Sequence, residues 1–141
     1  MSIIWGYILE APGRPPLAKQ REVMRALGVD MSEFGTCWHD KITKGSTRPR
    51  SQLTGRNDLL LAVMEGDKVV IAAPLCLGLS ERDAAWLLAE LAERKVEVTV
   101  NGDLDTIKPG DDHSDMLRRV ASAHNVHHVR VAKAKARAKS K

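Results

Sequence analysis

The chain has 141 residues, 43% of them hydrophobic, which is enough for one domain with a buried core and a short extension. No apolar stretch reaches the roughly 18 residues of a membrane span, and the N-terminus lacks the basic start and apolar run of a secretory signal. The two cysteines, Cys37 and Cys76, follow no metal-ligand spacing. We therefore expect a cytoplasmic protein with reduced thiols, no cofactor and no membrane attachment.

Positive charge is concentrated at the C-terminal end. Residues 118–141 contain eight of the 22 Lys and Arg residues and none of the 18 acids, so residues 1–117 carry about four net negative charges. A block of cations beside a mildly acidic body predicts a polyanionic partner such as DNA or RNA, with an anionic membrane as the weaker alternative. We take nucleic acid as that partner, with DNA favoured over RNA. A solubilising tail without a partner is the alternative. The cations expected to contact nucleic acid here are Arg118, Arg119, Arg130, Lys133, Lys135, Arg137, Lys139 and Lys141.

The first third of the chain predicts a strand, a helix and a loop. Residues 2–9 form an apolar run of strand length, and apolar residues at helical spacing before Gly28 predict a helix over 16–27. A short strand is expected around residues 34–38. Residues 41–56 are polar and contain no acid, which predicts a long loop that either clamps phosphates or is simply solvated. Its cations are Lys41, Lys44, Arg48, Arg50 and Arg56, and the last four are counted among the candidate nucleic-acid contacts.

The middle of the chain alternates helices and strands. A helix is expected over residues 57–64, and the continuous apolar run 68–74 is typical of a buried parallel strand. Ser80, with Asp83 three residues later, resembles a capping box that starts a helix reaching about residue 94. Residues 96–100 alternate like a strand. Units of this length predict an α/β fold with a mostly parallel sheet flanked by helices.

The end of the chain predicts a C-terminal helix and a basic tail. Residues 101–112 form a loop, and a helix follows it through at least residue 123. Residues 126–131 are compatible with helix or strand, and the last ten residues alternate Ala with cations and have no apolar face to bury. That tail is expected to be frayed or disordered alone and to order against a partner. The predicted organisation is an α/β domain at 1–112, a C-terminal oligomerisation helix at 113–131 and a flexible tail at 132–141.

Common catalytic and cofactor motifs are absent from the sequence. It contains no Walker loop, no Gly-x-Gly-x-x-Gly and no Gly-x-Ser-x-Gly elbow. His124, His127 and His128 have the spacing of one helix face, which fits either metal binding or solvent-facing and phosphate-contacting histidines. Cys37 and His39 share one side of a strand. A thiolate–imidazole pair that works as an active site beside the 41–56 loop is therefore a weaker hypothesis for the function, although nothing supplies an oxyanion hole.

The order of these pieces resembles the serine recombinase (resolvase/invertase) catalytic domain over residues 4–110. The resemblance rests on Gly6-Tyr7-Ile8-Leu9, the helix ending at residues 24–29, Asp40-Lys41, residues 65–71, Leu77-Gly78, the Ala/Leu-rich helix and residues 96–100. Gln20 matches a glutamine of the family's first helix, and either Arg50 or Arg56 stands at its mobile-loop arginine. The resemblance implies a resolvase-like α/β fold.

The residues that would carry the family's chemistry are missing. The family has a Tyr-x-Arg-x-Ser pattern whose serine attacks the DNA phosphodiester, and arginines that neutralise the phosphate. Tyr7 is present, but Leu9 replaces the arginine and Ala11 the serine. The family's Leu-Asp-Arg-Leu-Gly-Arg motif becomes Pro-Leu-Cys-Leu-Gly-Leu at residues 74–79. Without a nucleophile and its arginines the chain is not expected to be an enzyme.

The resemblance also implies an oligomerising domain whose last long helix makes dimer contacts and leads into DNA. Residues 118–131 stand at that helix, and too few residues follow for the family's helix-turn-helix domain. The basic tail is therefore expected to bind phosphates without reading bases. The sequence predicts a catalytically inactive homo-oligomer, a dimer or larger, with an accessory, regulatory or packaging role in a phage or mobile element. A protein-interaction or assembly module without nucleic-acid binding is the alternative.

Overall fold

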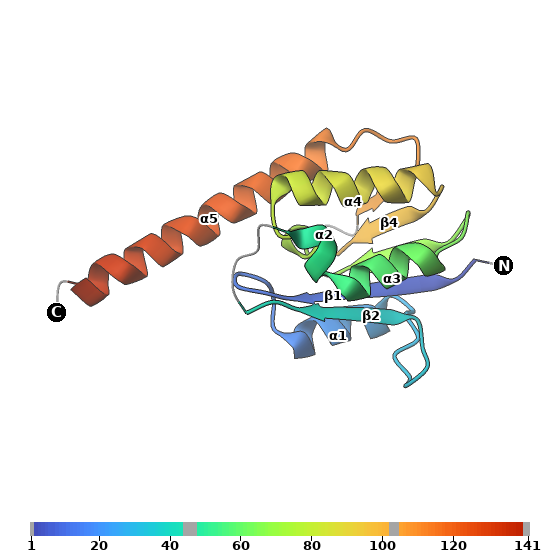
Figure 1. Ribbon diagram of the computed structural model, residues 1–141, viewed down its shortest axis with the longest axis horizontal. Helices are drawn as coiled ribbons and strands as arrows, with labels where there is room; N and C mark the ends of the chain where they lie inside the picture. Colours follow the sequence, from blue (N-terminus) through green and yellow to red (C-terminus); the bar gives the residue numbers. More distant parts are fainter. Residues whose placement is uncertain (1, 44–47, 102–104, 140–141) are drawn as a thin grey trace.

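The computed structural model describes residues 2–43, 48–101 and 105–139 (Figure 1). Its sheet has the strand order β2-β1-β3-β4-β5. The first four strands are parallel, and β5 pairs antiparallel with β4. The α/β class with a mostly parallel sheet, as predicted, is therefore confirmed. The strands are β1 (Ile4–Glu10), β2 (Cys37–Lys41), β3 (Lys68–Ile71), β4 (Glu97–Val100) and β5 (Asp105–Ile107).

Helices cover both faces of this sheet. Crossovers between parallel strands are right-handed. The chain moves across the sheet in one direction from β1 to β2 and in the other direction from β2 to β3, so the helices of these two connections lie on opposite faces. Figure 1 shows α3 and α4 in front of the sheet and α1 behind it. The helices are α1 (Leu17–Ala26), α2 (Pro49–Gln52), α3 (Thr54–Ala62), α4 (Glu81–Glu93) and α5 (Ser114–Lys139), and a 3-10 turn, η1, spans Pro74–Leu77.

The core is made by the apolar strands and one face of each covering helix. Leu87 and Leu91 of α4 are fully buried, as the helical spacing predicted. On the other face, α1 approaches β1 closely at Gly6. A Cβ atom placed on Gly6 would lie 2.7 Å from the sulfur of Met24 and 2.9 Å from Cγ1 of Val29, so any larger residue would force these side chains to shift.

Several local predictions are confirmed. The α1 helix lies within the predicted range 16–27, and β4 within 96–100. The hydroxyl of Ser80 accepts a hydrogen bond from the backbone N–H of Asp83 at 3.1 Å, which is the predicted N-cap of α4. This cap fixes where α4 begins and therefore which residues of its first turn face solvent.

Other local predictions are wrong. The second strand lies at 37–41 instead of 34–38, because only Asp40 in it is buried and an edge strand of this kind lacks an apolar pattern. The expected loop 41–56 contains α2 and the first turn of α3. The expected loop 101–112 contains β5, a strand of three residues that pairs with the edge of the sheet. Such short elements are decided by tertiary pairing and not by local pattern.

The C-terminal segment is one continuous helix. The ambiguous residues 126–131 are helical, and α5 runs on through the expected flexible tail to Lys139. Ala, Lys and Arg are strong helix formers, and the packed first turns provide the nucleus from which the helix propagates. Figure 1 shows the second half of α5 extending away from the α/β body toward the C-terminus.

Candidate nucleic-acid interface

The first turns of α5 anchor the helix to the body. Met116 and Val120 are buried, and α5 packs against η1 and α4. The carboxylate of Asp115 contacts Arg118 at 3.6 Å and Arg119 at 3.1 Å. Asp115 also lies in the first turn, where negative charge is favourable. These two predicted nucleic-acid contacts therefore lie in the anchored half of α5, beside an acid.

Three histidines mark the point where α5 leaves the body. A Cβ atom placed on Gly13 would lie 2.8 Å from Nδ1 of His127, so this ring packs directly on the β1–α1 loop. The ring centroids of His124 and His127 lie 6.3 Å and 6.0 Å from that of His128. Nε2 of His124 is buried and has no hydrogen-bond partner. Burial, followed by the positive charges of Arg14, His128 and His127, lowers the pKa of His124, and only the charge of Glu81 acts in the opposite direction.

A pH dependence follows from His124. Its pKa is depressed in the folded protein, so the unfolded chain takes up this proton first as pH falls below about 6.5. Stability is then lost progressively as pH falls through the folded value. Between pH 7.5 and pH 5 the midpoint of thermal unfolding is expected to fall more steeply for the natural protein than for His124→Asn. Parallel profiles of the two proteins in circular dichroism melts would contradict this assignment.

The outer part of α5 is an exposed basic surface. All side chains from His128 to Arg137 are exposed. Arg130, Lys133 and Arg137 follow i, i+3, i+7 spacing and share one face of the helix, while Lys135 points to the opposite side. The predicted contact Lys139 ends the helix, and Lys141 and Lys44 lie outside the described residues. We call residues 130–137 the basic face segment.

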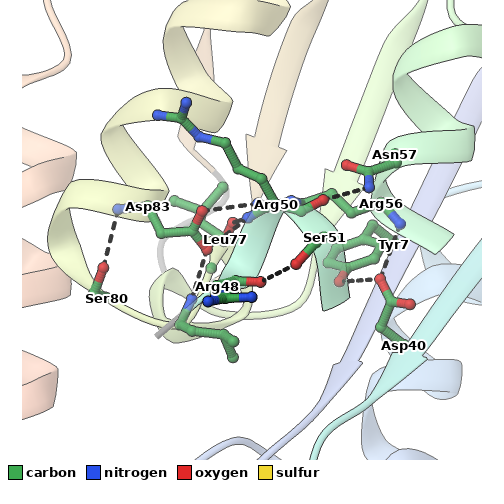
Figure 2. A network of polar contacts seen from close by, with 12 residues as sticks. Tyr7, Asp40, Arg48, Arg50, Ser51, Arg56, Asn57, Leu77, Ser80 and Asp83 are labelled. Atoms are coloured by element: carbon green, nitrogen blue, oxygen red, sulfur yellow. Dashed lines mark hydrogen bonds and ion pairs between the residues drawn. The ribbon is translucent and has the colours of Figure 1, made fainter. Parts of the chain in front are cut away.

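A second basic surface lies between α2 and α4. Arg48 and Arg50 are exposed and line a cleft of about 610 Å³, which also includes Arg82 from the first turn of α4. Figure 2 shows the Arg50 side chain extending from α2 toward α4. The carbon of the Arg50 guanidinium lies 4.7 Å from the centre of the Trp86 ring. A neighbouring cleft shares Leu79 and Ser80 with this one and reaches His124 and His128 of α5.

Arg56 is not a nucleic-acid contact, and that prediction is wrong. Its side chain is fully buried, and its two terminal nitrogens each lie 2.8 Å from a carboxylate oxygen of Asp83 (Figure 2). The guanidinium also donates to the carbonyl of Leu77 at 3.2 Å and lies 5.0 Å from the Trp86 ring centre. A buried cation must be paired, and this one ties α3 to α4 instead of facing solvent.

The buried network continues to the sheet. Tyr7 donates its phenolic hydrogen to Asp40 at 2.7 Å, and Asp40 also accepts the backbone N–H groups of Gly55 and Arg56 at 2.8 and 2.9 Å. Burial, and then the charge of Asp40, raises the pKa of Tyr7, which keeps its hydroxyl protonated as a donor. Sequence reasoning identified Arg56 only as a charge, because its partner Asp83 is 27 residues away.

The residues that the sequence resemblance places at catalytic positions are apolar and packed. Leu9 and Cys76 are fully buried, Leu75 is 7% exposed, and Ala11 and Leu79 pack against the same core. Burial raises the pKa of the Cys76 thiol to about 12, so it carries no thiolate near neutral pH.

A different side chain bridges this region. Arg14 donates hydrogen bonds to the backbone carbonyls of Leu75 at 2.9 Å and Gly78 at 2.6 Å. This cation is therefore committed to the backbone around η1, and burial lowers its pKa.

The proposed Cys37–His39 pair is not assembled. Nε2 of His39 lies 2.7 Å from a carboxylate oxygen of Glu10, and the sulfur of Cys37 lies 3.8 Å from the carbonyl oxygen of Trp38. Burial raises the pKa of Cys37 to about 11, which disfavours a nucleophilic thiolate. Within residues 2–43, 48–101 and 105–139, no three His, Cys, Asp or Glu side chains are grouped to hold a metal ion.

Comparisons with known proteins add no assignment. No protein-family model and no curated protein matches this chain. In the part of the chain that the structure describes, no helix is both long and apolar enough to cross a membrane. The candidate interface therefore consists of two surfaces: the basic face segment of α5, and the arginine-lined cleft, which the sequence did not reveal as a unit.

Proposed function

We propose that this chain is a catalytically inactive, resolvase-like protein that self-associates and binds nucleic acid non-specifically through α5. The observation that carries the proposal is the basic face segment, an exposed stretch of helix that contains four cations and no acid. Cations on an exposed helix neutralise phosphates and release counterions, which gives affinity without sequence preference. An accessory, regulatory or packaging role in a phage or mobile element fits such binding.

The test is the salt dependence of binding to duplex DNA. Fluorescence anisotropy with a labelled 20-base-pair duplex should give a logarithm of affinity that falls linearly with the logarithm of salt concentration. Two duplexes of unrelated sequence should give the same line. Affinity that does not change between ~50 and ~200 mM salt, or no binding at ~50 mM, would overturn the proposal.

Loss of catalysis is supported by the packing at the corresponding family positions. Leu9, Ala11 and Leu79 stand where the resemblance implies an arginine, a nucleophilic serine and a second arginine, and the pocket they would form is filled by apolar side chains. A phosphodiester would find neither a nucleophile nor charge compensation there. Nicking or recombination of supercoiled plasmid by the purified protein would contradict this part of the proposal.

Self-association is proposed through the apolar positions of α5 beyond the body. Val126 is 48% and Val129 is 52% exposed, at i, i+3 spacing and next to the basic face segment. The family resemblance implies dimer contacts at this helix, so the occupant of this face is taken to be a second copy of the chain.

Negative charge introduced at Val126 and Val129 should dissociate the oligomer. Val126→Asp/Val129→Asp is expected to weaken self-association at least about a hundredfold, because it buries two carboxylates against apolar side chains. Light scattering after size exclusion at several concentrations measures the shift. Val131→Asp, the same substitution at an exposed position on the opposite side of α5, is the matched control. A natural protein that is monomeric at all concentrations would contradict self-association.

An assembly module without nucleic-acid binding is the second candidate. It is favoured by three large apolar side chains outside α5: Phe34 is 94%, Leu61 83% and Met64 71% exposed. Leu61 lies in the last turn of α3 and Met64 just beyond its end, and both offer a contact to another protein. A regular oligomer in light scattering that gives no gel shift with DNA would favour this second function over the first.

A further inference from the structure

The cleft between α2 and α4 lies where open α/β sheets bind ligands. It is built by the connection that follows β2 and the connection that follows β3, and these two strands flank β1. The cleft opens at the carboxyl ends of these strands, on the face of the sheet that carries α3 and α4, and the strand order reverses direction next to it, between β1 and β3. Ligands of open α/β sheets usually bind outside the carboxyl ends of the strands, near the point of reversal.

The charge of this cleft is strongly positive. Arg48, Arg50 and Arg82 line it, and among the lining residues Asp83 is the one acid. Both carboxylate oxygens of Asp83 are occupied by Arg56, and one of them also accepts the backbone N–H of Leu79 at 2.9 Å. The buried pair neutralises itself, so Asp83 does not cancel the positive charge that the arginines bring to the cleft. The cleft also lies at the N-terminal end of α4, where the helix dipole adds to this potential.

The cationic side of the cleft is held in place. The carbonyl of Arg50 accepts a hydrogen bond from the Asn57 side chain, and its guanidinium lies over Trp86. The hydroxyl of Ser51 donates to the carbonyl of Arg48 at 3.1 Å, which stabilises the single turn of α2 (Figure 2). An arginine whose backbone and ring contact are fixed loses less conformational freedom when it binds an anion.

We propose that this cleft binds a small phosphorylated ligand through a phosphate group that Arg48, Arg50 and Arg82 share. Guanidinium groups match the geometry of phosphate oxygens with paired hydrogen bonds. A terminal phosphate or pyrophosphate carries two or more negative charges and matches three arginines better than the single charge of a backbone phosphodiester. A cleft of about 610 Å³ has the size of small-ligand sites, and Pro49 and Leu79 provide an apolar wall for the rest of the ligand.

Calorimetric titration of the full chain with inorganic pyrophosphate and adenosine monophosphate tests this site. Both should bind, adenosine should not, and Arg82→Gln should weaken both at least tenfold. Arg25→Gln, at an exposed arginine in the last turn of α1, should leave binding unchanged. No heat with ~5 mM pyrophosphate, or equal affinity in the natural protein and Arg82→Gln, would overturn the proposal.

A second set of variants distinguishes a small phosphorylated ligand from the backbone phosphates of duplex DNA. Lys133→Gln/Arg137→Gln should keep its affinity for pyrophosphate while its affinity for duplex DNA falls, because neither residue lines the cleft. If Arg82→Gln instead weakens only duplex binding and pyrophosphate does not bind, the cleft serves the polymer backbone and the small-ligand proposal is wrong. If DNA fails to bind in any variant while pyrophosphate binds, the proposed function fails and the cleft proposal stands.

Discussion

Removal of residues 130–141 is expected to lower the affinity for duplex DNA about a hundredfold or more at ~50 mM salt. Each phosphate that the protein no longer neutralises reduces the slope of log affinity against log salt by about 0.9, so the slope should fall by roughly three to five. The deleted stretch includes the exposed cations Arg130, Lys133 and Arg137 on one helix face. Anisotropy titrations over a range of salt concentrations measure both quantities.

Substitution of the cations by glutamine distinguishes the effect of lost charge on DNA binding from the effect of a shortened helix. Arg130→Gln/Lys133→Gln/Arg137→Gln should lower the slope by about three, because all three residues share one face. Lys135→Gln, on the opposite side of α5, should lower it by less than about one. Glutamine is a good helix former, so circular dichroism should show the same helix content in each variant. Equal effects at all four positions would show that DNA does not follow this face.

The main elements were predictable because their signals are local. Helix α4 combines an N-cap at Ser80 with apolar residues spaced for one buried face, and β3 is a continuous apolar run. Strand β2 was displaced because its stabilisation comes from pairing with β1 and from the buried Asp40, neither of which leaves a periodic pattern. The helical end of α5 was expected to fray because sequence reasoning weighed the missing apolar face above propensity and the anchored first turns.

The two basic surfaces differ in what the sequence reveals. The cations of α5 are adjacent in the chain, so composition alone detects them. Arg48 and Arg82 are brought to one cleft only by the crossovers that place α2 beside the start of α4. Arg56 lies close in sequence to Arg48 but points into the core, because Asp40 accepts the backbone N–H of Arg56 and Asp83 is positioned by the Ser80 cap. Burial, which decides between these roles, is a tertiary property.

The buried Arg56–Asp83 ion pair also holds together the helices around the cleft. The guanidinium and carboxylate are 0% and 2% exposed, and together they fix α3 and η1 against the first turn of α4. Arg56→Met is expected to lower the free energy of unfolding by about 3–5 kcal/mol, because it leaves the Asp83 carboxylate buried without its partner. The midpoint of thermal unfolding should fall by roughly 10 °C or more.

A double variant distinguishes the unpaired charge from simple loss of packing. Arg56→Met/Asp83→Asn removes the stranded charge while the amide oxygen can still accept the N–H of Leu79, so it should be more stable than Arg56→Met alone by at least about 1 kcal/mol. Glu65→Gln removes an ion pair whose side chains are 66% and 74% exposed and should cost no more than about 0.5 kcal/mol. If Arg56→Met is as harmless as Glu65→Gln in thermal and urea unfolding, the buried pair does not hold α3 against α4. If the double variant recovers nothing, the destabilisation comes from the absent interactions with Leu77 and Trp86, and not from charge.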